Sequence, residues 1–203
     1  DILYEVGDAT AIAAHRPAWE AQANGDDDRI RVEMNAAITA FWREADDDAA
    51  WAALDRAEGC APSAWRDEAS AVRATLLAVE GLPDRAIDVA SPLVDRDPDR
   101  VLIQAALALS HAYRSAGRSV DAVQTCDRAL AAYEVLGEQV ALFTARVMGA
   151  GRSIALADAG RLDDAEEEAE ATIRLCRTEG EEGGIGLAAE FGHHGIWARY
   201  ILY

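Results

Sequence analysis

The chain has 203 residues, 51% of them hydrophobic, and 37 acidic against 19 basic residues give it a net charge of −18. The apolar content suffices for a continuous core and excludes a disordered chain. The negative charge repels nucleic-acid phosphates and anionic membrane surfaces, so we expect this chain to contact neither nucleic acid nor membrane.

Composition and punctuation favour an all-α fold. The 15 glycines and 5 prolines lie mostly between apolar stretches, and alanine dominates elsewhere, which favours close helix packing over a sheet. No apolar run is long enough to cross a bilayer. The three cysteines, Cys60, Cys126 and Cys176, are irregularly spaced, which predicts a reducing, cytoplasmic setting.

Helical periodicity and capping signals predict about ten helices in chain order. They cover residues 9–23, 29–45, 46–59, 61–80, 83–95, 101–116, 120–136, 139–159, 162–178 and 185–203. In the second, one apolar stripe carries Ile30, Met34, Ile38, Phe41 and Trp42. Asp46–Asp48 and Asp97–Asp99 supply N-caps, and Pro83 suits a first turn. The chain starts without Met and ends in an apolar, uncapped stretch, so we expect a fragment of a larger multidomain protein.

One turn recurs along the chain. Ala116–Ala122 and Ala159–Ala165 have similar sequences 43 residues apart, with weaker copies at Gly81–Ala86 and Glu44–Ala49. The final alanines of the four copies then stand 37, 36 and 43 residues apart, with Glu44 in the place of the first glycine. Recurring turns at such a period predict an array of stacked helical hairpins.

The third copy resembles the tetratricopeptide repeat. The large, small, aromatic, glycine and small-residue sites of that motif match Leu109, Ser110, Tyr113, Gly117, Ala122, Cys126 and Ala129. Other copies depart from it, with Leu77 and Leu156 for the aromatic residue and Thr172 for the second small one. The resemblance implies an all-α solenoid of about five helix-turn-helix repeats, wound as a right-handed superhelix, with residues 1–203 as one domain and a concave ligand-binding groove.

A second resemblance rests on the C-terminal units. Tyr133–Glu138 and Leu175–Glu182 again stand about 43 residues apart, each followed by a long helix and a turn. Residues 100–190 thus resemble the sensor region of bacterial LuxR-type, maltose-regulator-like transcription activators. That family implies an ATPase module before this region, a DNA-binding domain after it, and an inducer bound by the repeats. Generic tetratricopeptide and kinesin-light-chain-like arrays have similar spacing.

Catalytic signatures are missing from the sequence. It contains no Gly-x-Ser-x-Gly elbow, phosphate-binding glycine loop, Cys-x-x-Cys pair or His-Glu-x-x-His helix, so we expect neither enzymatic activity nor a cofactor. Glu190 and His193 have the spacing of one half of a di-iron motif, but histidines at the surface or in the groove are favoured. The acidic run Asp163–Glu170 is interpreted as a solvated helix face.

Tetratricopeptide register places a set of polar and aromatic side chains on the concave face. The candidate ligand-binding residues are Arg31, Trp42, Glu68, Gln104, His111, Arg114 and Asp158, with Glu190, His194 and Trp197 closing the groove from the last helix. Met34 and Thr75 share that face. His111 and Arg114 lie one helical turn apart and form, with Gln104, the strongest donor cluster. The alternative is an exposed surface without a ligand.

Tryptophan usage bears on the ligand. Four of the five tryptophans lie in the first 65 residues, and each is either a wedge between helices or a stacking platform for a sugar or an aromatic peptide side chain. We therefore expect a regulatory domain that binds a small-molecule inducer, with a sugar as one candidate. The alternative is a scaffold that binds a peptide of a partner protein.

Overall fold

The structure is a computed structural model that describes residues 17–19, 21, 23, 25–60, 65–137 and 142–178. All regular secondary structure in these ranges is helical, which confirms the all-α prediction. Of the predicted helix at 9–23, only residues 17–19, 21 and 23 are described, and all of these except Ala23 are helical. The predicted last helix at 185–203 lies outside the described residues.

The remaining predicted helices are present, with ends that differ by a few residues. They are α3 (Asp26–Thr39), the π-helix η1 (Ala40–Glu44), α4 (Asp47–Gly59), α5 (Arg66–Val79), α6 (Pro83–Val94), α7 (Arg100–Ser115), α8 (Ser119–Leu136), α9 (Leu142–Asp158) and α10 (Leu162–Thr178). The predicted N-caps are confirmed, because the Asp46 and Asp99 carboxylates accept the backbone N–H groups of Ala49 (3.0 Å) and Leu102 (2.8 Å).

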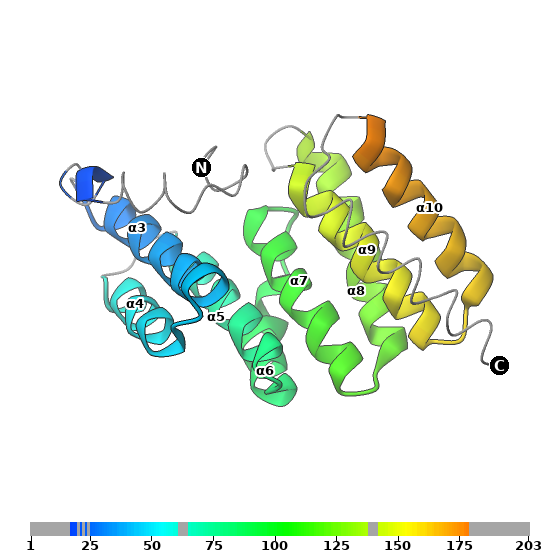
Figure 1. The fold of residues 1–203 in the computed structure, drawn as a ribbon, viewed down its shortest axis with the longest axis horizontal. Coiled ribbons are helices and arrows are strands. Elements are labelled where there is room, and N and C mark those ends of the chain that lie inside the picture. The colour runs from blue at the N-terminus through cyan, green and yellow to red at the C-terminus, as the bar shows by residue number, and fades with distance from the viewer. Residues whose placement is uncertain are drawn as a thin grey trace.

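The helices pack in chain order, with α3 against α4, α5 against α6, α7 against α8, and α9 against α10. Contacts also join alternate helices, because α5 lies against both α3 and α7, and α7 lies against α9. Figure 1 shows the result as an elongated row in which each helix lies beside its neighbours along the chain.

Three of the predicted turns share one backbone geometry. Gly81, Gly117 and Gly160 have φ values of 79°, 73° and 78°, a region that favours glycine because it has no Cβ. The residue after each glycine donates its N–H to the carbonyl five positions earlier, as Leu82 does to Leu77 (2.9 Å), Arg118 to Tyr113 (2.7 Å) and Arg161 to Leu156 (2.9 Å). These hydrogen bonds end one helix, and the turn directs the chain into the next helix.

The first copy of the turn differs from the prediction by one residue. Ala45, not Glu44, adopts the left-handed conformation, with φ 52°, and the N–H of Asp46 donates to the carbonyl of Ala40 at 3.0 Å. The left-handed residues therefore stand 36, 36 and 43 positions apart. The equivalent helix alanine is Ala50, which is fully buried, whereas the predicted Ala49 is exposed.

The π-helix also corrects the predicted apolar stripe. Ile30 and Met34 are buried and Ile38 and Phe41 are partly buried, as expected, but Trp42 is 54% exposed. The wider turn of η1 shifts the helical register by about one residue. Trp42 is thereby rotated out of the stripe, and its ring meets Phe41 edge-on at 5.1 Å between centroids.

Alanine dominates the core. Ala50, Ala86, Ala122 and Ala165, which follow the four turns, are all completely buried. A side chain this small lets two helix backbones approach closely, so the same residue type serves the same purpose in each hairpin. No helix among the described residues has the length and apolarity needed to cross a bilayer.

In the last hairpin, one contact between the two helices has a smaller side chain on α9 and a larger one on α10 than the equivalent contact of the preceding hairpin. A Cβ built on Gly149 of α9 would lie 2.5 Å from Oγ1 of Thr172 on α10. Ala106 and Ala129, 43 residues earlier in each case, share one buried cluster. The last hairpin thus pairs glycine with threonine where the preceding one pairs two alanines.

We predict that Ala45→Gly raises the free energy of unfolding by about 1 kcal/mol, because glycine removes the strain of a left-handed alanine. The matched change Gly117→Ala introduces that strain without a steric contact, since nothing lies within 4 Å of the added Cβ, and should lower the stability by a similar amount. Urea denaturation measures both. Equal effects of the same sign would contradict the assigned turn register.

We also predict that Gly149→Ala lowers the free energy of unfolding by about 1 kcal/mol, because overpacking against Thr172 outweighs the gain in helix propensity. Adding Thr172→Ala should recover most of this loss, since two alanines fill the contact in the preceding hairpin. A double-mutant cycle with simple additivity would show that the two residues do not touch.

Candidate functional site

The candidate residues Arg31, Glu68, Gln104, His111, Arg114 and Asp158 form a line from α3 to α9, which we call the polar row. It begins with a cluster around Trp65, at the start of α5. The guanidinium groups of Arg31 on α3 and Arg100 on α7 lie 5.1 Å and 5.3 Å from the centroid of its ring. Arg100 also donates to the carboxylate of Glu68 at 2.9 Å. Burial raises the pKa of Glu68 against the opposing effects of Arg100 and Arg31. Three helices thus converge on one stacked, charged cluster.

The next contact along the row joins α5 to α7. The side-chain amide of Gln104 donates to the hydroxyl of Thr75 at 3.3 Å, and that hydroxyl in turn donates to the carbonyl of Ala71 at 3.0 Å. Gln104 is therefore held against the neighbouring helix rather than projecting freely.

The row continues from α7 to α9. The guanidinium of Arg114 donates to the carboxylate of Asp158 at 3.1 Å, and both side chains are about four-fifths buried, with exposed fractions of 23% and 19%. One turn before Arg114, partial desolvation and the charge of Arg114 lower the pKa of His111. His111 is therefore a neutral imidazole at neutral pH, with one donor and one acceptor nitrogen.

Most of the predicted ligand-binding residues that the structure describes lie at contacts between neighbouring hairpins. Trp42 does not join them, being exposed on η1. Glu190, His194 and Trp197 lie outside the described residues. Arg100 was not predicted from the sequence, and Trp65 was predicted only as one of the tryptophans that are either wedges or stacking platforms. Arg100 had a usable signal, because it stands one helical turn before Gln104 and so shares its face.

A pocket of about 280 Å³ opens on the opposite side of α5. Its lining side chains are Trp51 and Asp55 from α4, Arg73, Leu77 and Glu80 from α5 and its end, and Arg85 from α6. Arg73 and Leu77 stand two residues either side of Thr75, roughly 160° from it around the helix axis. The pocket and the polar row are therefore separate surfaces.

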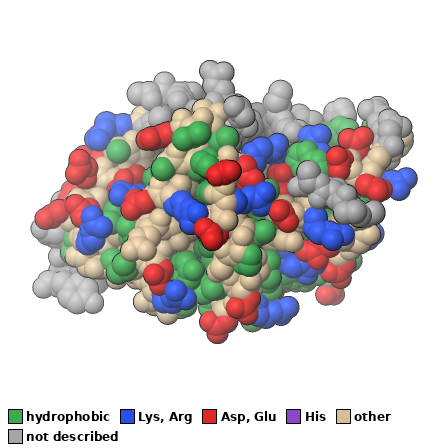
Figure 2. Space-filling view, turned by 180° about the vertical axis from the view of Figure 1, so that it is seen from behind, with side chains coloured by type: hydrophobic (Ala, Val, Ile, Leu, Met, Phe, Trp, Pro, Cys, Tyr) green, Lys and Arg blue, Asp and Glu red, His purple; other side chains and the backbone are tan. Residues whose placement is uncertain are grey.

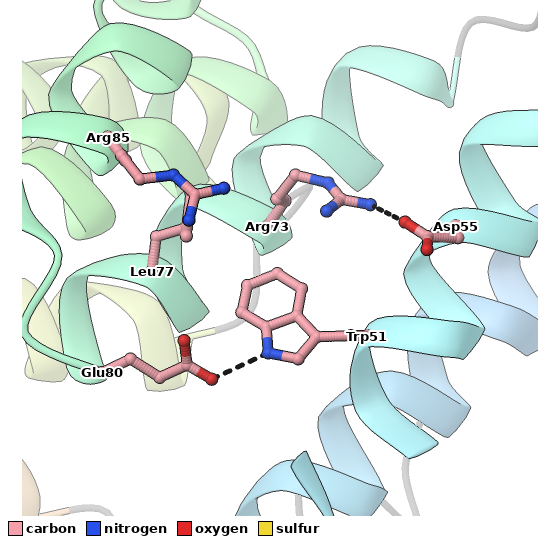
Figure 3. A pocket seen from close by; sticks show the side chains of 6 residues that line it. All are labelled: Trp51, Asp55, Arg73, Leu77, Glu80 and Arg85. Atoms are coloured by element: carbon pink, nitrogen blue, oxygen red, sulfur yellow. Dashed lines mark hydrogen bonds and ion pairs between the residues drawn. The ribbon is translucent and has the colours of Figure 1, made fainter. Parts of the chain in front are cut away.

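Trp51 lies at the centre of the pocket (Figure 3). Its indole N–H donates to Oε1 of Glu80 at 2.8 Å, and the guanidinium of Arg73 lies 5.4 Å from its ring centroid. Arg73 also donates to Asp55 and to Glu58, at 2.7 Å in each case. Trp51 is one of the four tryptophans in the first 65 residues, for which the sequence predicts either a wedge or a stacking platform. Its partner Glu80 is 29 residues away, so local sequence patterns give no signal for this contact.

On the face drawn in Figure 2, arginine and acidic side chains are interspersed, and the described residues form no large patch of one sign. Most arginines among the described residues form ion pairs, as Arg96 does with Asp67 and Asp99 at 2.9 Å. The described part of this face lacks the basic stripe that tracks a phosphate backbone.

Cys126 and the potential metal ligands are candidates for chemistry among the described residues. Burial raises the pKa of Cys126 to about 12, so its thiol is protonated at neutral pH and is not an activated nucleophile. Among the described residues, no three His, Cys, Asp or Glu side chains are grouped to hold a metal ion. The geometry of the polar row and of the pocket suits binding.

Comparison of the chain with protein-family models, curated proteins and solved structures gives no match.

We predict that the wild-type protein loses stability relative to Glu68→Gln as the pH rises above 4.5, the ordinary pKa of this carboxyl. In the folded protein the pKa of Glu68 is raised above its ordinary value of 4.5. The folded state therefore binds more protons than the unfolded state in this pH range, and the free energy of unfolding of the wild type falls as the pH rises. Glutamine cannot titrate. Urea denaturation at several pH values measures the difference, and a difference that moves the other way would refute the burial of this carboxyl.

Proposed function

We propose that the chain is a non-catalytic ligand-sensing module of a larger cytoplasmic regulator, built as a tetratricopeptide-like solenoid. The fold supports this, because the left-handed turn, its hydrogen bond and its buried alanine recur at intervals of 36, 36 and 43 residues. Contacts of α5 with α7 and of α7 with α9 are those expected when the first helices of successive repeats stack.

The observation that carries the sensing proposal is the set of polar contacts between hairpins. Arg100 to Glu68 and Arg114 to Asp158 join first helices of successive hairpins. A ligand that takes hydrogen bonds from these side chains exchanges an internal contact for an external one. It therefore has different affinities for different hairpin arrangements, which is the requirement for a population shift.

The chemistry of the row favours a neutral polyhydroxyl ligand, such as a sugar. The neutral imidazole of His111 and the side-chain amide of Gln104 can both donate and accept, and Asp158 accepts. A net charge of −18 disfavours anionic ligands at long range. By resemblance to the LuxR-type activators, such occupancy would be passed to attached ATPase and DNA-binding domains.

A peptide-binding scaffold is the second candidate, supported by exposed apolar side chains at successive turns. Val79 and Leu82 flank the turn at Gly81, and Val120, which is 63% exposed, follows the turn at Gly117. Trp42 is exposed just before the turn at Ala45. Exposed apolar side chains that recur at the turns of successive hairpins suit a protein partner.

We expect sugars that bind the row to raise the unfolding temperature progressively with concentration. The probes are glucose, maltose and trehalose, followed by differential scanning fluorimetry. In His111→Ala/Arg114→Ala the shift should disappear, because both donors are gone, while the circular dichroism spectrum stays helical.

The matched control is Arg118→Ala, which removes an arginine paired locally with Asp121 outside the row, and it should retain the shift. Sugar stabilisation that survives in the double variant would remove these residues from the site. The absence of any sugar effect, with saturable binding of a defined peptide instead, would favour the scaffold.

A further inference from the structure

Arg85 departs from the pattern that the third and fourth turns follow. Four residues after their left-handed glycines, the third and fourth turns carry Asp121 and Asp164, which pair with Arg118 and Arg161 at 2.7 Å and 2.6 Å. The second turn has Leu82 and Arg85 at the corresponding positions. The charge at the fourth position is therefore reversed, and its local partner is replaced by an apolar residue.

As a consequence, Arg85 has five N–H donors that no ion pair uses within the described residues. In Figure 3 its guanidinium points inward, above Leu77 and toward the space beside Trp51. The other cation of the pocket, Arg73, is held by Asp55 and Glu58. Arg85 is thus the group in this pocket best placed to receive an anionic group from a ligand.

The pocket also presents acceptors and an apolar wall. Glu80 uses Oε1 for the indole of Trp51, and Asp55 uses Oδ1 for Arg73, which leaves a second carboxylate oxygen on each. Leu77 and the indole of Trp51 supply the apolar surface. A ligand that complements all of these lining side chains needs an anionic group, a cationic donor and an apolar body within a short distance of one another.

Size and net charge narrow the ligand further. The volume of about 280 Å³ lies just below the range of roughly 300–1,000 Å³ that drug-sized ligands occupy. The net charge of −18 opposes a ligand that is anionic overall, whereas a zwitterion is not repelled at long range.

We propose that this pocket binds a free amino acid with an apolar side chain. Its carboxylate pairs with Arg85, its ammonium group lies against Glu80, and its side chain packs on Trp51 and Leu77. The site goes beyond the sensing row of the proposed function, from which α5 separates it, and it does not depend on that proposal.

The test follows the indole N–H signals of the full 203-residue chain by two-dimensional nitrogen-15 NMR, with Trp51→Phe identifying the Trp51 signal. L-phenylalanine and L-leucine should shift the Trp51 signal saturably. Arg85→Gln should weaken this binding at least about tenfold, because a charge-assisted hydrogen bond contributes roughly 1.5–3 kcal/mol. The other indole signals report that the variant is folded.

The matched control is Arg66→Gln, on α5 but outside the pocket and likewise without an ion pair among the described residues, and it should leave the affinity unchanged. Phenethylamine, which lacks the carboxylate, and 3-phenylpropionate, which lacks the ammonium group, should both bind at least about tenfold more weakly. The proposal is overturned if neither amino acid shifts the Trp51 signal, if Arg85→Gln binds normally, or if 3-phenylpropionate binds as well as L-phenylalanine. His111→Ala/Arg114→Ala should leave this binding intact, which separates the result from the sugar experiment.

Discussion

A left-handed residue followed five positions later by a fully buried alanine is the constraint on which this arrangement depends. The left-handed residue closes the hydrogen bond that ends one helix, and the alanine lets the next helix pack back against it. A larger side chain at Ala86 or Ala122 would push the two helices apart. Because each hairpin supports the next, such a displacement would propagate along the row and alter both surfaces described above.

The junctions between hairpins vary within this fixed frame. Arg73 and Arg152 each stand eight residues before a left-handed glycine, and each pairs with an aspartate ten residues after the preceding left-handed residue, Asp55 or Asp127. At the junction between them the same two positions hold Leu109 and Ser91. Ion pairs of this kind between hairpins contribute modestly to the free energy of unfolding where they are exposed. The apolar core, in which alanine is the commonest buried residue, is shared by all the hairpins.

Local signals in the sequence were sufficient for the helices but not for the sites. Asp46, Asp99 and Pro83 mark helix starts by hydrogen bonding and fixed φ, which act within a few residues and are visible in the chain. The π-helix before Ala45 has no such mark, so the first turn was misplaced by one residue and Trp42 was assigned to the core stripe. Periodicity placed Gln104, His111 and Arg114 on one face. It could not find the partner of Arg114, because Asp158 lies 44 residues away and their meeting depends on how hairpins stack.

Helix α5 connects the two surfaces physically. It carries Glu68 and Thr75 on the side of the polar row and Arg73 and Leu77 on the side of the pocket, and it packs against α3, α6 and α7. A rotation of α5 about its own axis would lengthen the contact of Thr75 with Gln104 while changing the distance from Trp51 to Glu80. Packed helices resist small continuous rotations, because their side chains interdigitate. Occupancy on one side of α5 therefore reaches the other side only if the helix has a second packed position, and any coupling between the two sites must be equal in both directions.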